Sequence, residues 1–82
     1  MAKIVLQREV ARDFANGEAA IEILADDVRQ LIKKLELKFP GIGDRLRERT
    51  AIAIDGEIFQ DPMLQPIHEH SEVYFLPMIE GG

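Results

Sequence analysis

The chain ends in Gly81-Gly82, and these residues are its strongest candidates for chemistry. Because glycine has no Cβ, two terminal glycines can enter a narrow channel and bring the carboxylate to a nucleotide phosphate or an attacking nucleophile. A carboxylate is a poor electrophile until it is adenylated, after which a sulfur or amine nucleophile can capture the acyl group. The alternative interpretation is an inert, frayed end.

The residues before the glycines define the tail that would carry this carboxylate. Met78, Ile79 and Glu80 follow Pro77, and residues 78–82 can extend at most about 16 to 18 Å, at 3.3 to 3.6 Å per residue. We therefore predict a folded domain over residues 1–77 and a flexible tail over residues 78–82. Such a tail is long enough to enter a deep pocket of another protein.

Other combinations of reactive residues are incomplete. His68-Glu69-His70 can turn two imidazoles to one side of an extended segment, but two ligands do not make a zinc site and the chain has no cysteine to complete one. We expect a solvated loop and no bound metal. Without cysteine there is also no thiolate nucleophile, persulfide or disulfide on the chain. No catalytic triad order or phosphate-binding glycine loop is present, which indicates a participant in chemistry done by other proteins and not an enzyme.

Charge is unevenly distributed along the chain. Residues 1–49 hold ten bases and nine acids, whereas residues 50–82 hold six acids and no base. An acidic C-terminal part repels phosphate backbones and attracts a basic partner, so a protein partner is favoured over nucleic acid. No apolar run approaches the 18 or so residues of a membrane span, and the charged start is unlike a signal peptide. These features predict a cytoplasmic protein that does not bind membranes.

The first half of the chain predicts two strands and one amphipathic helix. Apolar and polar residues alternate over residues 3–6 and 20–24, and the turn dipeptide Asn16-Gly17 lies between them, which predicts an antiparallel pair with a wide loop. Asp26 is expected to cap a helix that ends at Phe39-Pro40-Gly41. The apolar stripe of this helix recurs at i, i+3, i+4 and i+7, in Val28, Leu31, Ile32 and Leu35.

The second half predicts a hairpin and a final strand. Residues 51–54 and 57–59 flank Asp55-Gly56, which favours a two-residue hairpin turn because both of its residues tolerate φ > 0. One short turn of helix is expected within residues 42–49, and residues 60–71 are expected to be mostly loop. Residues 72–76 form the last strand and end at Pro77.

This order predicts an α+β fold, with a mixed sheet of four to five strands and one main helix across one face. Eighty-two residues allow a single domain. If the first and last strands are central neighbours, the tail leaves from mid-sheet. Val73 and Phe75 are then expected in the core, while Tyr74 and Leu76 form an exposed apolar patch beside the tail. Leu37 points away from the helix stripe and is expected to pack under the following loop.

Three stretches, taken in order, resemble the ubiquitin-like sulfur carriers, typified by the small subunit of molybdopterin synthase and the sulfur carrier of thiamine biosynthesis. The stretch from Val28-Arg29-Gln30-Leu31-Ile32 to Phe39-Pro40-Gly41 resembles the family's single helix and its exit. Ile52-Ala53-Ile54-Asp55-Gly56 resembles its V-x-V-N-G hairpin. Glu72-Val73-Tyr74-Phe75-Leu76-Pro77, leading to Gly81-Gly82, resembles D-E-V-x-F-x-P-P-x-x-G-G. Two departures are His70-Ser71, where the family has Gly-Asp, and Met78, where a second proline is common.

The resemblance implies a β-grasp fold and a carrier protein that binds no cofactor itself. An activating enzyme, using ATP and Mg²⁺, would adenylate Gly82, which then becomes a thiocarboxylate and gives its sulfur to a synthase or large subunit. In this interpretation Gly81 supplies clearance and Pro77 marks the exit of the tail. Contacts to partners are expected from Leu76 and Tyr74, and along the tail from Met78, Ile79 and Glu80.

The tail alone leaves the sulfur recipient open and is compatible with two rival functions. Chain size and the Phe-Pro-Gly helix exit favour molybdopterin synthesis, with thiamine, cysteine, tRNA thiolation or a secondary metabolite as alternatives. A second hypothesis is a protein modifier that joins its C-terminus to lysines of target proteins. A third is a plain interaction domain whose end is inert.

Overall fold

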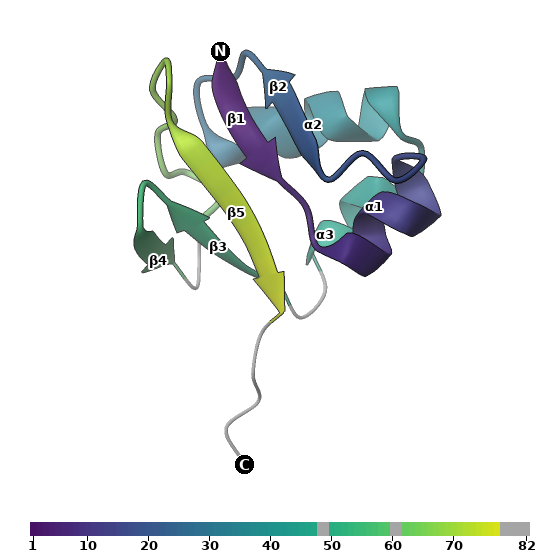
Figure 1. The fold of residues 1–82 in the computed structure, drawn as a ribbon. Helices are drawn as coiled ribbons and strands as arrows, with labels where there is room; N and C mark the ends of the chain where they lie inside the picture. Colours follow the sequence, from purple (N-terminus) through teal and green to yellow (C-terminus); the bar gives the residue numbers. More distant parts are fainter. Residues whose placement is uncertain (48–49, 60–61, 78–82) are drawn as a thin grey trace.

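The computed structural model describes residues 1–47, 50–59 and 62–77, which form a mixed sheet with helices gathered on one side of it (Figure 1). The elements in chain order are β1 (Ala2–Val5), α1 (Arg8–Phe14), β2 (Ala20–Ile23), α2 (Val28–Lys38), α3 (Ile42–Arg47), β3 (Thr50–Ile54), β4 (Glu57–Phe59) and β5 (Glu72–Pro77). The predicted α+β class and mixed sheet are confirmed. In the described residues, no helix is long and apolar enough to cross a membrane.

The five strands lie in the order β2-β1-β5-β3-β4. β1 and β5 run parallel in the centre, with Ile4 opposite Val73, so the first and last strands are central neighbours, an arrangement that the sequence left conditional. β2 and β3 pair antiparallel to β1 and β5 respectively, and β4 forms the far edge. The last strand of the chain is therefore hydrogen-bonded on both sides.

The connection between β1 and β2 differs from the wide loop that the sequence predicts, because residues 8–14 form α1. Val10 and Ala11 are buried, and Phe14 packs against the core, so one face of this short helix is apolar at i, i+1 and i+4. No side chain caps its N-terminus. Seven residues without a cap give a weak local signal, and tertiary packing decides the structure.

Helix α2 has the predicted apolar stripe, whose four members are at most 1% exposed. Its N-cap is Asp27 and not the predicted Asp26: the Asp27 carboxylate accepts a 2.7 Å hydrogen bond from the Gln30 N–H, and Gln30 Oε1 accepts one from the Asp26 N–H. The predicted packing of Leu37 is wrong, since this side chain is 85% exposed. Leu37 follows buried Leu35 by two residues, which places its side chain about 200° further round the helix and away from the core.

The predicted helix exit at Phe39-Pro40-Gly41 is confirmed, with Gly41 at φ +96°. The Glu36 carboxylate accepts hydrogen bonds from the N–H groups of Gly41 (2.7 Å) and Gly43 (2.9 Å), which lower its pKa. These bonds join the end of α2 to the start of α3. The short helical turn expected after this exit is α3.

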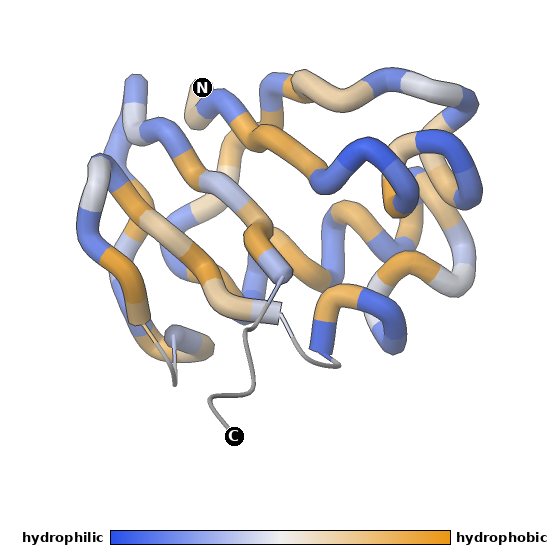
Figure 2. Tube along the Cα trace, turned by 60° about the horizontal axis from the view of Figure 1, so that its bottom comes forward, coloured by the Kyte–Doolittle hydropathy of each residue, from blue (hydrophilic) through white to orange (hydrophobic). Residues whose placement is uncertain are grey.

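The hydrophobic core lies between the helices and one face of the sheet. Hydrophobic and hydrophilic stretches alternate along the strands (Figure 2), and the largest fully buried side chains include Phe75, Ile4 and Leu31, one each from β5, β1 and α2. β5 thus contributes to the centre of the core. Its position is fixed by packing as well as by hydrogen bonds on both sides.

Candidate functional site

β5 is the element that positions the candidate site. It ends at Pro77, which lies opposite Thr50 of β3. Gly81 and Gly82, together with Met78, Ile79 and Glu80, lie outside the described residues. The geometry of the site is therefore that of the strand from which the tail continues.

The side chains of β5 alternate as the sequence predicts. Val73 and Phe75 are 0% and 2% exposed in the core, whereas Tyr74 is 36% exposed on the opposite face. Leu76 shares the face of Tyr74 and is half-buried. The face that the helices leave open therefore carries apolar side chains at the root of the tail.

Strand register extends this apolar surface across the whole sheet. Val5 and Ala53 flank Tyr74, Ala20 lies beyond Val5, and Ile58 lies beyond Ala53. We call Ala20, Val5, Tyr74, Ala53 and Ile58 the open-face row. Ile58, at its β4 end, is 63% exposed. The sequence predicts only Tyr74 of this row. The other four residues lie beside Tyr74 because of the strand register, which the alternation of apolar and polar residues does not specify.

A groove of about 460 Å³ lies where β1 and β5 end. One wall is the end of β1 and the start of α1, from Val5 to Glu9, and the other is the end of β5, from Tyr74 to Pro77. We call it the β5 groove. It is mostly apolar and carries two charged residues, Arg8 and Glu9. The Glu9 carboxylate lies 3.9 Å from the Arg45 guanidinium of α3.

A cluster of hydrogen bonds fixes the start of β5 to the β3–β4 turn. The predicted turn is confirmed, with Asp55 at φ +49° and Gly56 at φ +88°. The Asp55 carboxylate accepts hydrogen bonds from the Glu72 N–H (2.8 Å) and the Ser71 hydroxyl (3.0 Å), and the Asp55 N–H donates to the Glu72 carbonyl (2.9 Å). The bond from Glu72, then that from Ser71, lower the pKa of Asp55 because both favour its charged form.

Substituting Asp55 should reduce the pH dependence of stability. Its folded pKa lies below an unfolded value near 3.9, so its charge stabilises the fold above that pH, and the effect is lost as pH falls through the folded pKa. Between about pH 5 and pH 2.5, the melting temperature of the wild type should fall more steeply than that of Asp55→Asn. Asparagine tolerates the left-handed turn position, so the turn is kept. Parallel melting curves for the two proteins would contradict this role.

Comparison with known families covers most of the chain, including its C-terminal residues. The sequence model of the ThiS family matches residues 8–82. The chain belongs to the ThiS family. This membership confirms the resemblance to the ubiquitin-like sulfur carriers that the helix, hairpin and C-terminal patterns predict. No curated protein sequence matches the chain.

Two solved structures share the fold of this ThiS family member. CysO of Mycobacterium tuberculosis, described as an antigen, has a TM-score of 0.86 and 18% identity over 96% of this chain and 100% of its own. A structure of the BexX/CysO complex of Amycolatopsis orientalis contains a chain with a TM-score of 0.83 and 20% identity, with both chains fully covered. The predicted β-grasp fold is confirmed.

The structure gives a physical account of one departure from the expected family pattern. His70, where the pattern has Gly, adopts φ +72°, and Ser71, where it has Asp, is 3% exposed. The Ser71 hydroxyl accepts a 3.0 Å hydrogen bond from the His68 N–H while donating to Asp55. The serine therefore links the loop, the hairpin turn and β5.

The two histidines themselves are exposed, and the His70 imidazole lies 4.0 Å from the Glu69 carboxylate. Within residues 1–47, 50–59 and 62–77, no group of three or more His, Asp or Glu side chains is arranged to hold a metal ion. This part of the loop is best described as solvated, as the sequence predicts for His68-Glu69-His70.

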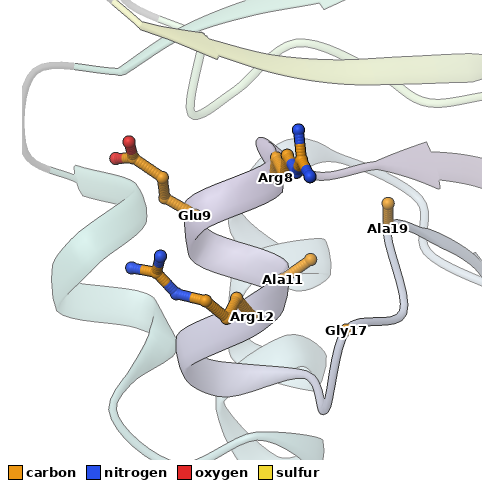
Figure 3. Close-up of a pocket in the computed structure, with 6 residues that line it drawn as sticks. All are labelled: Arg8, Glu9, Ala11, Arg12, Gly17 and Ala19. Atoms are coloured by element: carbon orange, nitrogen blue, oxygen red, sulfur yellow. The ribbon is translucent and has the colours of Figure 1, made fainter.

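A second pocket, of about 550 Å³, lies beside α1 and is lined by Arg8, Glu9, Ala11, Arg12, Gly17 and Ala19 (Figure 3). Arg8 and Arg12 point in different directions, and Arg12 donates a 2.9 Å hydrogen bond to Asp13. The two guanidinium groups therefore do not converge on one anion. The β5 groove, at the root of the tail, is the better candidate for function.

Proposed function

We propose that this chain is a sulfur carrier of the ThiS/CysO type, in which the carboxyl group of Gly82 is adenylated and then converted to a thiocarboxylate. One observation supports this most: the ThiS family match runs to residue 82, through the central strand β5 and the Gly81-Gly82 ending. The domain provides a rigid handle, and the tail carries the acyl group.

The proposed chemistry needs little from the domain itself. The Gly82 carboxylate attacks the α-phosphate of ATP and pyrophosphate leaves, which forms an acyl-adenylate. Hydrosulfide, HS⁻, then attacks the acyl carbon, AMP leaves, and the acyl group is left as the thiocarboxylate. ATP and Mg²⁺ are bound by the activating enzyme, and this chain acts as its protein substrate. A sulfur-accepting synthase or large subunit is the second partner.

Partners are proposed to dock on the open-face row and on Leu76. These side chains lie on the sheet face opposite the helices, and Leu76 is next to Pro77, where the tail begins. An exposed apolar surface at that place can hold a partner whose active site receives the tail. Of the tail residues, Met78, Ile79 and Glu80 are proposed to contact the channel that admits Gly81 and Gly82.

Truncating this docking surface should weaken activation without stopping it. We expect Tyr74→Ala and Leu76→Ala each to raise KM for the carrier in adenylation by about five- to thirtyfold, the range of 1 to 2 kcal/mol typical of interface anchors. The catalytic constant should change little, because the tail is intact. Leu37→Ala is the matched control, since Leu37 is exposed on α2, on the helix side. Equal KM values for all three variants would contradict docking here.

The proposed sulfur recipient remains a molybdopterin precursor, the choice that chain size and the Phe-Pro-Gly helix exit favour. Neither structural relative has a name that points to molybdopterin. The alternative recipients that the sequence leaves open should therefore be tested in parallel with the molybdopterin precursor. Thiocarboxylate-loaded carrier is supplied to purified synthases of molybdopterin, thiamine and cysteine formation, and sulfur transfer to each product is measured.

Mass spectrometry of the intact chain tests the general function. Incubation with ATP, Mg²⁺ and the adenylating enzyme of the same genome should produce the acyl-adenylate, and adding a sulfur donor should replace one oxygen of the terminal carboxyl by sulfur. Species joined to other proteins through lysine would support the modifier hypothesis instead. An unchanged mass under conditions that activate a known ThiS family carrier would overturn the proposal.

A further inference from the structure

The β5 groove contains a cation, Arg8, that the described residues leave unpaired. Among the described residues, the other bases of β1, α1 and α3 have acidic neighbours: Lys3 lies between Glu22 and Glu72 in the strand register, Arg12 pairs with Asp13, Arg45 with Glu9, and Arg47 with Asp44. Arg8 makes no ion pair with any described residue. Glu9, the other charged residue of the groove, lies 3.9 Å from the Arg45 guanidinium and makes no ion pair with Arg8.

The same groove leaves a backbone acceptor of β5 unused. The Ser71 carbonyl faces β1, where it accepts from the Lys3 N–H, while the Glu72 carbonyl faces β3. This alternation places the Phe75 carbonyl on the β1 side. β1 ends before it reaches this carbonyl, because the Leu6 N–H donates to the Ala19 carbonyl and Gln7 is already the N-cap of α1. No described residue donates to the Phe75 carbonyl.

These features together describe a place for one more stretch of extended chain. The apolar walls suit an apolar side chain, the Phe75 carbonyl can accept a backbone N–H as a continued β1 would donate, and the Arg8 guanidinium can pair with a carboxylate. We infer that the β5 groove binds an extended, carboxylate-bearing segment of the activating enzyme, with Arg8 as its anchor. This inference rests on the proposed function, because it names how the partner recognises the root of the tail.

Charge distribution favours a protein segment of this kind over other occupants. The chain from residue 50 onward has no base, so a partner surface that faces this end should be largely basic. Arg8 is the exception and would repel such a surface unless an acid lies opposite it. A single carboxylate in the partner would then fix the orientation in which the carrier docks, since rotated arrangements place Arg8 against partner bases. The groove borders Pro77, so this contact is continuous with the proposed docking surface.

Charge reversal at Arg8 tests this inference, with Arg12→Glu as the matched control. Both arginines lie on α1 and both changes alter the net charge equally, but Arg12 is outside the β5 groove. With the adenylating enzyme as the probe, Arg8→Glu should raise KM for the carrier by about tenfold or more and leave the catalytic constant nearly unchanged. Arg12→Glu should have less than about a twofold effect. Arg8→Lys, which keeps the charge but not the bidentate geometry, should fall between them.

The outcomes separate the inference from the proposed function. If the wild type is adenylated but Arg8→Glu and Arg12→Glu have the same KM, the groove does not bind an acidic segment. If the wild type is not adenylated at all, the proposed function fails and the inference falls with it. Unchanged melting temperatures show that each variant is folded. A lysine substitution of one acidic residue in the enzyme that restores the KM of Arg8→Glu, but not that of Tyr74→Ala, would identify the partner carboxylate.

Discussion

Removing Gly81 and Gly82 should abolish acyl-adenylate formation completely while the domain stays folded. The reacting carboxylate would then belong to Glu80, about 7 Å short of its proper position at 3.3 to 3.6 Å per residue. It would also bring a side chain into a channel that glycine passes without one. We expect no adenylate in the intact mass spectrum, even at carrier concentrations far above the wild-type KM.

Two measurements distinguish this loss from general damage. The truncated chain should melt within about 2 to 4 °C of the wild type, the shift that corresponds to less than about 0.5 kcal/mol, because the core and the pairing of β5 are unchanged. It should also compete with the wild type for the activating enzyme, since Tyr74, Leu76 and Arg8 are still present. A truncated chain that is adenylated normally would show that the Gly-Gly ending is inert, as in a plain interaction domain.

An extension gives the complementary result. Adding one alanine after Gly82 leaves both glycines in place but moves the carboxylate one residue further and adds a Cβ. If the position of the carboxylate is what matters, this variant should be as inactive as the truncated one, provided that its mass shows the alanine to be retained. Normal activity of the retained extension would contradict the proposed reaction at Gly82.

The parts of the fold that the sequence predicts correctly are those with a strong local signal. Periodicity alone predicts which side chains are buried in the helix stripe from Val28 to Leu35 and in β5. The φ preference of Asp55-Gly56 predicts the turn. The central position of β5 depends on its pairing with β1, which the sequence left conditional. Its neighbours on the open face do not follow from those patterns.

The features that escape the sequence depend on tertiary contacts. Helix α1 is seven residues long and has no side-chain cap, so packing of Val10 and Ala11 decides it rather than propensity. Ile58 joins Tyr74 only through two strand registers, and the β5 groove exists only because β1 stops at Val5 while β5 continues to Pro77. The role proposed for Arg8 therefore cannot be predicted from the sequence, where Arg8 is one of ten basic residues.

Truncating Phe75 should be the most damaging single change to the domain. Its side chain is 2% exposed, among the largest fully buried ones, and it lies on the strand that is paired on both sides. We expect Phe75→Ala to lower the free energy of unfolding by about 3 to 5 kcal/mol, through lost burial and the cavity that remains. That is a large part of the roughly 4 to 12 kcal/mol expected for a domain of this length.

Urea denaturation of Phe75→Ala and Leu37→Ala measures this difference directly. Leu37 is 85% exposed, so its truncation should cost less than about 0.5 kcal/mol. Because Phe75 lies between Tyr74 and Leu76, its core contacts hold the docking side chains in register. The folded fraction of Phe75→Ala should still be adenylated, since the tail is unchanged, but activity should fall at the urea concentration where the strand unfolds. A loss below about 1 kcal/mol would contradict the anchoring of the tail by core packing at Phe75.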